Sequence, residues 1–449
     1  MRLSPKKRST TPHPVDEVLP AGRSLAYGIQ HVAAMYAGVI APPLIIGQAA
    51  GLDPARMTLL LAASLLTAGL ATILQSVGLG PVGARLPFVN GVTFAAVAPV
   101  LAILAAPGGG LGVVYGAVLV AGLLAVLAAP VFSRLVRFFP PLVNGSVITL
   151  IGISLLPVAV RWIVGQDSAP NHGSPERLGL GALAFALVLL LNRFARGFAH
   201  RVSLLIALLA GTLLAWPLGL VDSSTFDHAP AFALPVPFQL ATPEFSGPAV
   251  LSLCVVMLVA MTESTADMIA LGEVVGRPVT ERTLTAGLRA DGAGSALSAV
   301  FGGFTCSAFA QNIGLVALTR VRSRFVVATS GGVLVLLGLF PVVGATVSLV
   351  PKPVLGGAAL VLFGSVAASG IRTLGQCDLS ETGNALVVAG SLGTGLIPVV
   401  SPDFSAHLPA AVRTVLDSGI SAGCLTAIAL NLLFHGVRAR KSTSESAST

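Results

Sequence analysis

Fourteen apolar segments follow one another along the chain, and they constrain its fold more than any other feature. They lie near residues 25–50, 57–79, 86–105, 111–131, 142–164, 178–192, 202–220, 247–272, 284–302, 305–319, 325–349, 353–370, 383–400 and 411–435. A helix needs roughly 20 apolar residues to cross a bilayer, and most of these segments are about that long. Charged residues make up 10% of the chain, against about 25% in soluble domains. We therefore predict an all-α polytopic membrane protein.

Two of the fourteen segments are broken. In the tenth, a strand-like Ser307–Ala310 leads into two amides, Gln311 and Asn312, and then into a short apolar helical run. In the third, an extended run from Arg85 leads to an Asn-Gly step and another short apolar helix. Such paired interruptions in two halves of a transporter indicate its binding site, where free N–H groups and the helix dipole face the ligand. The alternative is a pair of re-entrant loops with a structural role.

The distribution of basic residues supports the span count. If the N-terminus is cytoplasmic, only five of the 26 Lys and Arg residues fall in outer loops: Arg56, Arg161, Arg177, Lys352 and Arg413. This bias fits the positive-inside rule and a plasma-membrane protein with both termini in the cytoplasm. Because seven is an odd number, two seven-span repeats, 25–220 and 247–437, are inverted relative to each other. Residues 1–24 and 438–449 are expected to be cytoplasmic tails, the second disordered.

Several functional classes find no support in the sequence. The basic residues form no stripe, so nucleic acid is not an expected partner. The four cysteines lack metal or disulfide spacing, and neither a metal nor another cofactor is predicted. The chain has no phosphate-binding loop for ATP. An intramembrane enzyme is one alternative, but no Ser/His/Asp or metal-ligand constellation in the sequence supports it.

Ionisable side chains at membrane depth are functional candidates, because burying a charge in lipid is unfavourable. Glu263 and Asp267 in the eighth span are i,i+4 neighbours and share a helix face. Glu263 can take up a proton and can accept paired N–H bonds from a planar heterocycle. Asp291 opens the ninth span, and His31 lies in the first. Each residue also has a structural alternative. Glu263 could be a structural carboxylate, and Asp267 could cap the helix or pair with a neighbour. Asp291 could be a helix N-cap, and His31 could be a buried core histidine.

Gln311 presents one donor and one acceptor on a single amide. That pair matches a ring with adjacent C=O and N–H groups, which is the edge of an oxo-purine or oxo-pyrimidine. The alternative is an amide that only satisfies unwound backbone.

The run from Gln311 to Arg320, Q-N-I-G-L-V-A-L-T-R, resembles the signature of the nucleobase–ascorbate transporter family, also called nucleobase:cation symporter 2. Supporting matches are Gln30-His31-Val32, Glu263-x-x-x-Asp267 and Ala290-Asp291-Gly292, so the resemblance covers about residues 22–437. It implies a core domain of spans 1–4 and 8–11 and a gate domain of spans 5–7 and 12–14. It also implies a homodimer formed through gate helices.

The same resemblance implies roles for individual residues. The base would lie between the short strands of spans three and ten, held by Glu263 and Gln311, with backbone near Phe94 and Ala310 assisting. Asn312 would orient the site, and Thr93 places a hydroxyl before the phenylalanine. Asp291, Asp267 and His31 would support the site and its proton coupling.

The expected substrate is a purine. Gln at the first signature position resembles the xanthine and urate branch, whereas Asn90 stands where xanthine carriers often have Gln, which leaves the choice of base open. We predict uptake of xanthine or uric acid by symport with protons rather than sodium, because no cage of sodium ligands is readable. The alternatives are a symporter for uracil or another nucleobase, and an anion carrier of the same architecture.

Overall fold

A computed structural model describes residues 13–132, 140–165, 171–221, 232–342, 346, 349–401, 403–405, 407–409, 412–413 and 416–435. Among these residues, eight helices are long and apolar enough to cross a membrane, and four shorter apolar helices accompany them. Helical structure is present in every one of the fourteen predicted segments. The predicted all-α class is thus confirmed.

The first half of the chain contains α1 (Ala21–Ala49), α2 (Pro54–Val77), strand β1 (Asn90–Val92), the 3-10 turn η2 (Phe94–Ala96), α3 (Val97–Ala105), α4 (Leu111–Ala128), α6 (Pro141–Val164), α7 (Pro175–Phe194), α8 (Phe198–Arg201) and α9 (Ser203–Ala215). The second half contains α11 (Gly247–Val275), α12 (Glu281–Phe301), strand β2 (Cys306–Ala308), α13 (Gln311–Thr319), α14 (Arg324–Leu339), α16 (Lys352–Leu374), α17 (Thr382–Val400) and α19 (Gly419–His435). A further 3-10 turn, η1 (Pro14–Asp16), precedes α1. The order of long and broken elements is therefore the same in both halves.

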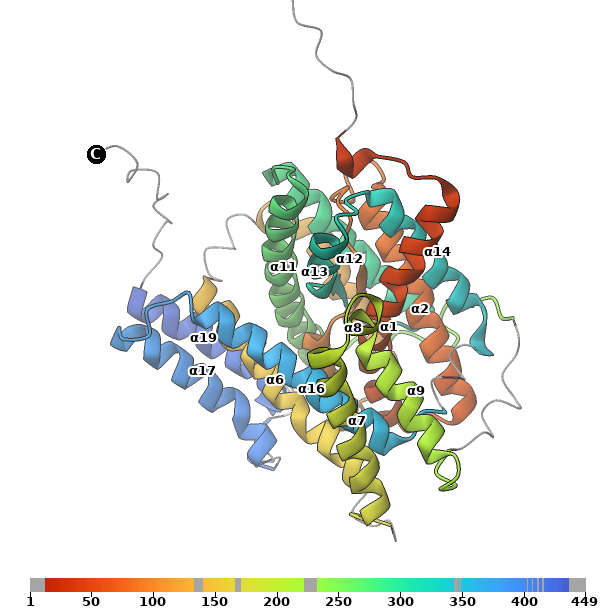
Figure 1. The fold of residues 1–449 in the computed structure, drawn as a ribbon. Coiled ribbons are helices and arrows are strands. Elements are labelled where there is room, and N and C mark those ends of the chain that lie inside the picture. The colour runs from red at the N-terminus through yellow and green to blue at the C-terminus, as the bar shows by residue number, and fades with distance from the viewer. Residues whose placement is uncertain are drawn as a thin grey trace, which may run out of the picture.

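The helices form two groups by their contacts. In Figure 1, α6, α16, α17 and α19 of the second group lie at the lower left, and α7 and α9 lie in front. The first group consists of α1, α2, α4, α11, α12 and α14 with the two broken segments, and the second of α6, α7, α9, α16, α17 and α19. Within the first group, α2 packs on α14 and α4 packs on α12, so each pair takes one helix from each half.

Glycines allow these two pairs to approach closely. A Cβ added to Gly69 of α2 would lie 2.5 Å from the carbonyl oxygen of Gly331 on α14. A Cβ added to Gly122 of α4 would lie 2.7 Å from the carbonyl oxygen of Gly292 on α12. Small residues at such crossings are typical of membrane helices. The second span meets the eleventh as the ninth meets the fourth, which is the relation that inverted seven-span repeats produce.

Candidate functional site

The two broken segments meet in a short antiparallel ribbon. Asn90 of β1 is opposite Ala308 of β2, and Val92 is opposite Cys306. The ladder continues at both ends, since the Phe309 N–H donates to the Val89 carbonyl at 3.0 Å and the Thr93 N–H to the Thr305 carbonyl at 2.9 Å. The Asn-Gly step of the third segment, which we expected after the extended run, lies within β1 itself. Backbone pairing between the halves thus satisfies polar groups that lipid would leave unpaired.

A short helix follows each strand. Thr93 caps η2, its hydroxyl accepting the Ala95 N–H at 3.3 Å. On the other side, Ala310 is exposed and precedes α13, whose first residue is Gln311. The Gln311 side chain lies outside the part of the chain that the structure describes. The Asn312 N–H donates to the Phe309 carbonyl and the Ile313 N–H to the Ala310 carbonyl, both at 3.0 Å. We expected free N–H groups at this helix start, and these two are instead bonded. This tight first turn is one of the usual ways to satisfy a helix N-terminus.

Helix α11 brings Glu263 to the ribbon. Ser264, the next residue, accepts the Ala308 N–H of β2 at 3.3 Å. The same helix contacts η2, α3 and α13, so it touches both broken segments. Glu263 is half-buried, and no residue that the structure describes forms a hydrogen bond with its carboxylate. It is therefore a half-buried acceptor whose hydrogen-bonding capacity no described residue uses.

The acids of the eighth and ninth spans form a cluster. Glu263 and Asp267 are four residues apart on α11 and so lie on one face of that helix, and Asp291 of α12 lies within electrostatic range of Asp267. The prediction that Asp291 opens the ninth span is wrong, because α12 begins ten residues earlier, at Glu281. Asp291 lies in the middle of α12 and is fully buried, while Thr280 caps the helix and accepts the Thr283 N–H at 3.3 Å. The helix begins in polar residues before the apolar run, and the apolar pattern alone therefore placed its start too late.

Asp291 is held by amides from the first half of the chain. The Asn90 Nδ2 donates to Asp291 Oδ1 at 2.6 Å, and the Gln75 Nε2 donates to the same oxygen at 3.3 Å. The second oxygen, Oδ2, is buried and has no hydrogen-bond partner among the described residues. Asp291 is therefore tied to both β1 and α2.

His31 and Asn312 form a second link between the halves. His31 Nδ1 lies 2.7 Å from Asn312 Oδ1, and Asn312 Nδ2 donates to the Pro87 carbonyl at 2.6 Å. Because Asn312 uses its nitrogen on Pro87, its oxygen must accept, which assigns the proton to His31 Nδ1. His31 and Asn312 are both buried. The pair fixes the start of α13 against α1 and against the segment that leads into β1.

Phe94 lies where the two helix groups meet. Its ring makes an edge-to-face contact with Phe363 of α16, with centroids 5.9 Å apart and planes at 74°. Phe363 is fully buried. Phe94, whose backbone we expect to assist in binding the base, thus contacts an aromatic side chain of the second group.

The sequence did not single out Gln75, Ser264 or Ser295. Ser295 accepts the Cys306 N–H of β2 at 2.9 Å and donates to the Asp291 carbonyl at 2.8 Å. Gln75 had a readable signal, since it is a polar residue inside an apolar span. Serines are common in membrane helices, so Ser264 and Ser295 had none.

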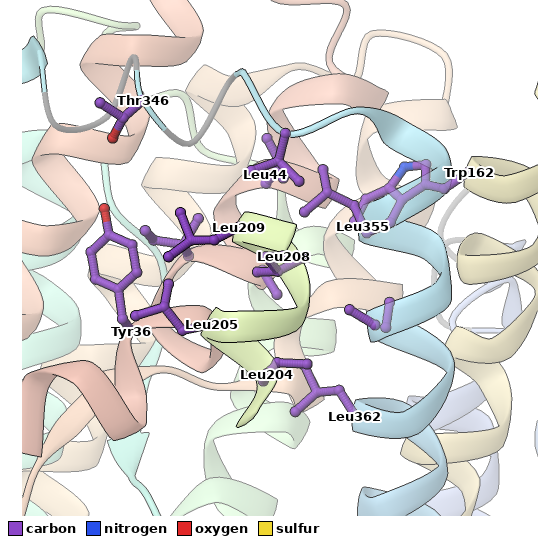
Figure 2. A pocket seen from close by; sticks show the side chains of 15 residues that line it. Tyr36, Leu44, Trp162, Leu204, Leu205, Leu208, Leu209, Thr346, Leu355 and Leu362 are labelled. Carbon is purple, nitrogen blue, oxygen red and sulfur yellow. The ribbon is translucent and has the colours of Figure 1, made fainter. Parts of the chain in front are cut away.

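Figure 2 shows a cavity of about 140 Å³ between α1, α6, α9 and α16, which is separate from the predicted site. Its lining is almost wholly apolar and contains none of the predicted site residues. The lining residues that Figure 2 labels are Tyr36, Leu44, Trp162, Leu204, Leu205, Leu208, Leu209, Thr346, Leu355 and Leu362.

Gly91 makes the packing of β1 possible, and it gives a first prediction. A Cβ at Gly91 would lie 2.4 Å from the ring of Phe309, which is buried against it. Gly91→Ala should displace Phe309 and the adjoining start of α13, and reduce substrate uptake about tenfold or more at equal surface expression. Gly332→Ala on α14 is the control, because a Cβ there meets nothing within 4 Å. Equal uptake by the two variants would contradict this account of β1.

The fold and the site together define a multi-pass membrane transporter of the seven-plus-seven inverted-repeat architecture. The transmembrane domain of a cyanobacterial bicarbonate transporter, BicA, superposes with a TM-score of 0.62, 16% sequence identity and coverage of 92% of this chain and 99% of that one. That similarity shows the fold alone.

Sequence comparison identifies the family. A profile described as "Permease family" matches residues 22–404. The uric acid transporter UacT of Escherichia coli (strain K12) is 40% identical over 94% of this chain and 88% of its own length. The xanthine permease of Bacillus subtilis (strain 168) is 39% identical over 92% of this chain and 94% of its own. The chain belongs to the nucleobase–ascorbate transporter family.

Proposed function

We propose that this protein imports a purine nucleobase, uric acid or xanthine, across the plasma membrane by proton symport. The observation that carries the proposal is Glu263, a half-buried carboxylate beside β2 that lacks a hydrogen-bond partner among the described residues. A planar purine presents adjacent N–H groups that such a carboxylate can accept. The similarity to a urate transporter and a xanthine permease over nearly the whole chain supports the same substrate class.

The other residues take complementary roles in this proposal. Gln311, at the start of α13, reads a C=O and N–H edge of the base, and Phe94 packs on its ring. Ala310 and Thr93 add polar backbone and a hydroxyl, while Asn312 keeps α13 in place through His31. Each of these residues lies on a broken segment or in contact with one.

Proton coupling follows from the acidic cluster. Glu263, Asp267 and Asp291 place three carboxyl groups within mutual electrostatic reach through Asp267, and no described Lys or Arg forms an ion pair with any of them. Three uncompensated charges are unfavourable at membrane depth. Proton uptake by the cluster removes that penalty, and release on the cytoplasmic side completes the cycle.

The two helix groups supply a mechanism of alternating access. The first group holds every proposed site residue and acts as the core domain, and the second acts as the gate and carries the dimer contact. Rocking of one group against the other exposes the site to each side in turn. The distribution of Arg and Lys along the sequence predicts that both termini are cytoplasmic.

The two transport alternatives make different demands on the site. Sulfate and bicarbonate offer no pair of adjacent N–H donors to Glu263, whereas a purine does, which disfavours an anion carrier. Uracil or another nucleobase would use the same contacts as a purine. Uptake of labelled uric acid, xanthine, guanine, uracil and bicarbonate by cells that express the chain, against cells with an empty vector, distinguishes these substrates.

The coupling ion gives a second prediction. Accumulation of uric acid or xanthine should fall to the level of passive entry when a protonophore is added, and it should be unchanged when sodium is replaced by potassium. The reason is that the proposed driving ion binds carboxyl groups and no cage of sodium ligands is readable in the sequence. Accumulation that survives the protonophore and disappears without sodium would overturn proton symport.

A further inference from the structure

Gln75 is a polar side chain that makes three hydrogen bonds and that the proposed function does not yet use. It lies near the end of α2 and is completely buried. Its Oε1 accepts the Ala84 N–H at 3.0 Å, and its Nε2 donates to the Gly287 carbonyl and to Asp291 Oδ1, both at 3.3 Å. An amide has two N–H donors, so both are used. Gln75 therefore joins α2, the segment before β1, and α12.

Asp291 Oδ1 is the point where this network reaches the ribbon. The same oxygen accepts from Asn90 at 2.6 Å, and Asn90 is the first residue of β1. The backbone of Asn90 is also held by α2, since its N–H donates to the Thr72 hydroxyl at 3.0 Å and its carbonyl accepts from that hydroxyl at 3.3 Å. Two amides on one oxygen fix the rotation of the carboxyl group, and they leave Oδ2 as the oxygen that can take a proton.

We propose that Gln75 is a positioning residue of the transport site: it orients Asp291, and through Asp291 it holds strand β1 in place. This inference rests on the proposed function for its link to purine uptake. The contacts themselves do not depend on the substrate. Without Gln75, Asp291 Oδ1 keeps only the Asn90 donor, so the carboxyl group is less constrained and its link to α2 is lost.

Few other charged groups act on Asp291. From the elements packed against α12, the groups in electrostatic range are Asp267 of α11 and the Cys306 thiol of β2. In α4, Tyr115 donates instead to the Gly302 carbonyl, and in α2, Arg56 donates to the Leu240 carbonyl. On α12 itself, Glu281, Arg282 and Arg289 form no ion pair with a described residue. The neutral groups that act on the Asp291 carboxyl group are Gln75, Asn90 and the Ser264 hydroxyl of α11.

The first test is transport kinetics at equal surface expression. Gln75→Met keeps the length and removes all three hydrogen bonds, and it should raise the KM for uric acid or xanthine about tenfold or more. Ser76→Ala is the matched control, because it removes one buried hydrogen bond, to the Phe88 carbonyl, from the same helix end. Its KM should stay within about twofold of wild type. A wild-type KM in Gln75→Met would overturn the proposal.

Gln75→Glu provides a variant of unchanged size. It places a carboxyl group beside Asp291, and neighbouring carboxyl groups hold a shared proton to higher pH. The pH profile of uptake should therefore shift towards higher pH, which a packing defect would not produce. An unshifted profile would show that position 75 does not act through Asp291.

A double-mutant cycle separates this proposal from the proposed function. Gln75→Met, Asp291→Ala and the double variant are purified, and their thermal unfolding is compared without substrate. The two changes should be strongly non-additive, because both remove the same contact. Additive shifts would overturn the positioning role. If the cycle is non-additive but cells that express the wild-type protein accumulate no purine, the positioning role of Gln75 is supported and the proposed function is wrong.

Discussion

Replacing Glu263 with Gln is expected to abolish accumulation of uric acid and xanthine. The substitution removes the proposed negative acceptor for the N–H groups of the base, and it removes a group that can carry a proton. Hydrogen bonds to charged groups contribute about 1.5–3 kcal/mol each, so loss of two such bonds lowers affinity by roughly two to four powers of ten. Uptake should fall to the level of cells that lack the protein.

The measurement is initial uptake of labelled uric acid and xanthine, normalised to the amount of protein at the surface. Glu273→Gln is the matched control, since it makes the same chemical change on the same helix at an exposed position. The control should transport like wild type. Accumulation near the wild-type rate by Glu263→Gln would remove Glu263 from the mechanism. Retained exchange without accumulation would instead assign it to proton coupling alone.

The architecture was predictable because its signals are strong and local. Long apolar runs define the spans, and the distribution of Arg and Lys predicts their orientation. The amides Gln311 and Asn312 mark a break in the tenth span, because an unbroken membrane helix would have apolar residues there. The inverted relation of the halves then follows from an odd number of spans. The structure adds that Gly69 with Gly331, and Gly122 with Gly292, make equivalent crossings in the two halves.

The polar pairings inside the site were not predictable from the sequence. Asn90 bonds to Asp291 from 201 residues away, and His31 bonds to Asn312 from 281 residues away. Apolar periodicity says which face of a helix is buried, but it does not say which polar side chain on another helix will be its partner. Candidates such as Asp291 and His31 were found because ionisable groups are rare in membranes, whereas a neutral amide such as Gln75 gave a weaker signal.

The start of α12 shows a related limit. The apolar run begins after Glu281 and Arg282, and the helix begins with them because the Thr280 side chain caps it. A span boundary read from hydropathy alone therefore places Asp291 too close to the N-terminal end of the helix. The difference matters for function, because a buried mid-helix carboxyl group can take part in proton coupling and an exposed N-cap cannot.

Replacing Gln311 with Glu should change which base is recognised more than how much protein reaches the membrane. The amide offers one donor and one acceptor, whereas an ionised carboxylate only accepts. The C=O of uric acid or xanthine that faces position 311 would lose its donor, and an unpaired buried acceptor costs about 1–3 kcal/mol. Affinity for those purines should therefore fall by roughly one to two powers of ten, and uracil should compete better than it does with wild type.

Competition by a panel of purines and pyrimidines against labelled uric acid or xanthine tests this prediction, with each variant normalised to surface expression. Gln376→Glu is the control, because it makes the same change at an exposed residue after α16. A second carboxyl group near Glu263 should also alter proton binding by the pair, so the pH dependence of uptake should change in Gln311→Glu and not in the control. If wild type and Gln311→Glu give the same inhibition profile, Gln311 does not read the base.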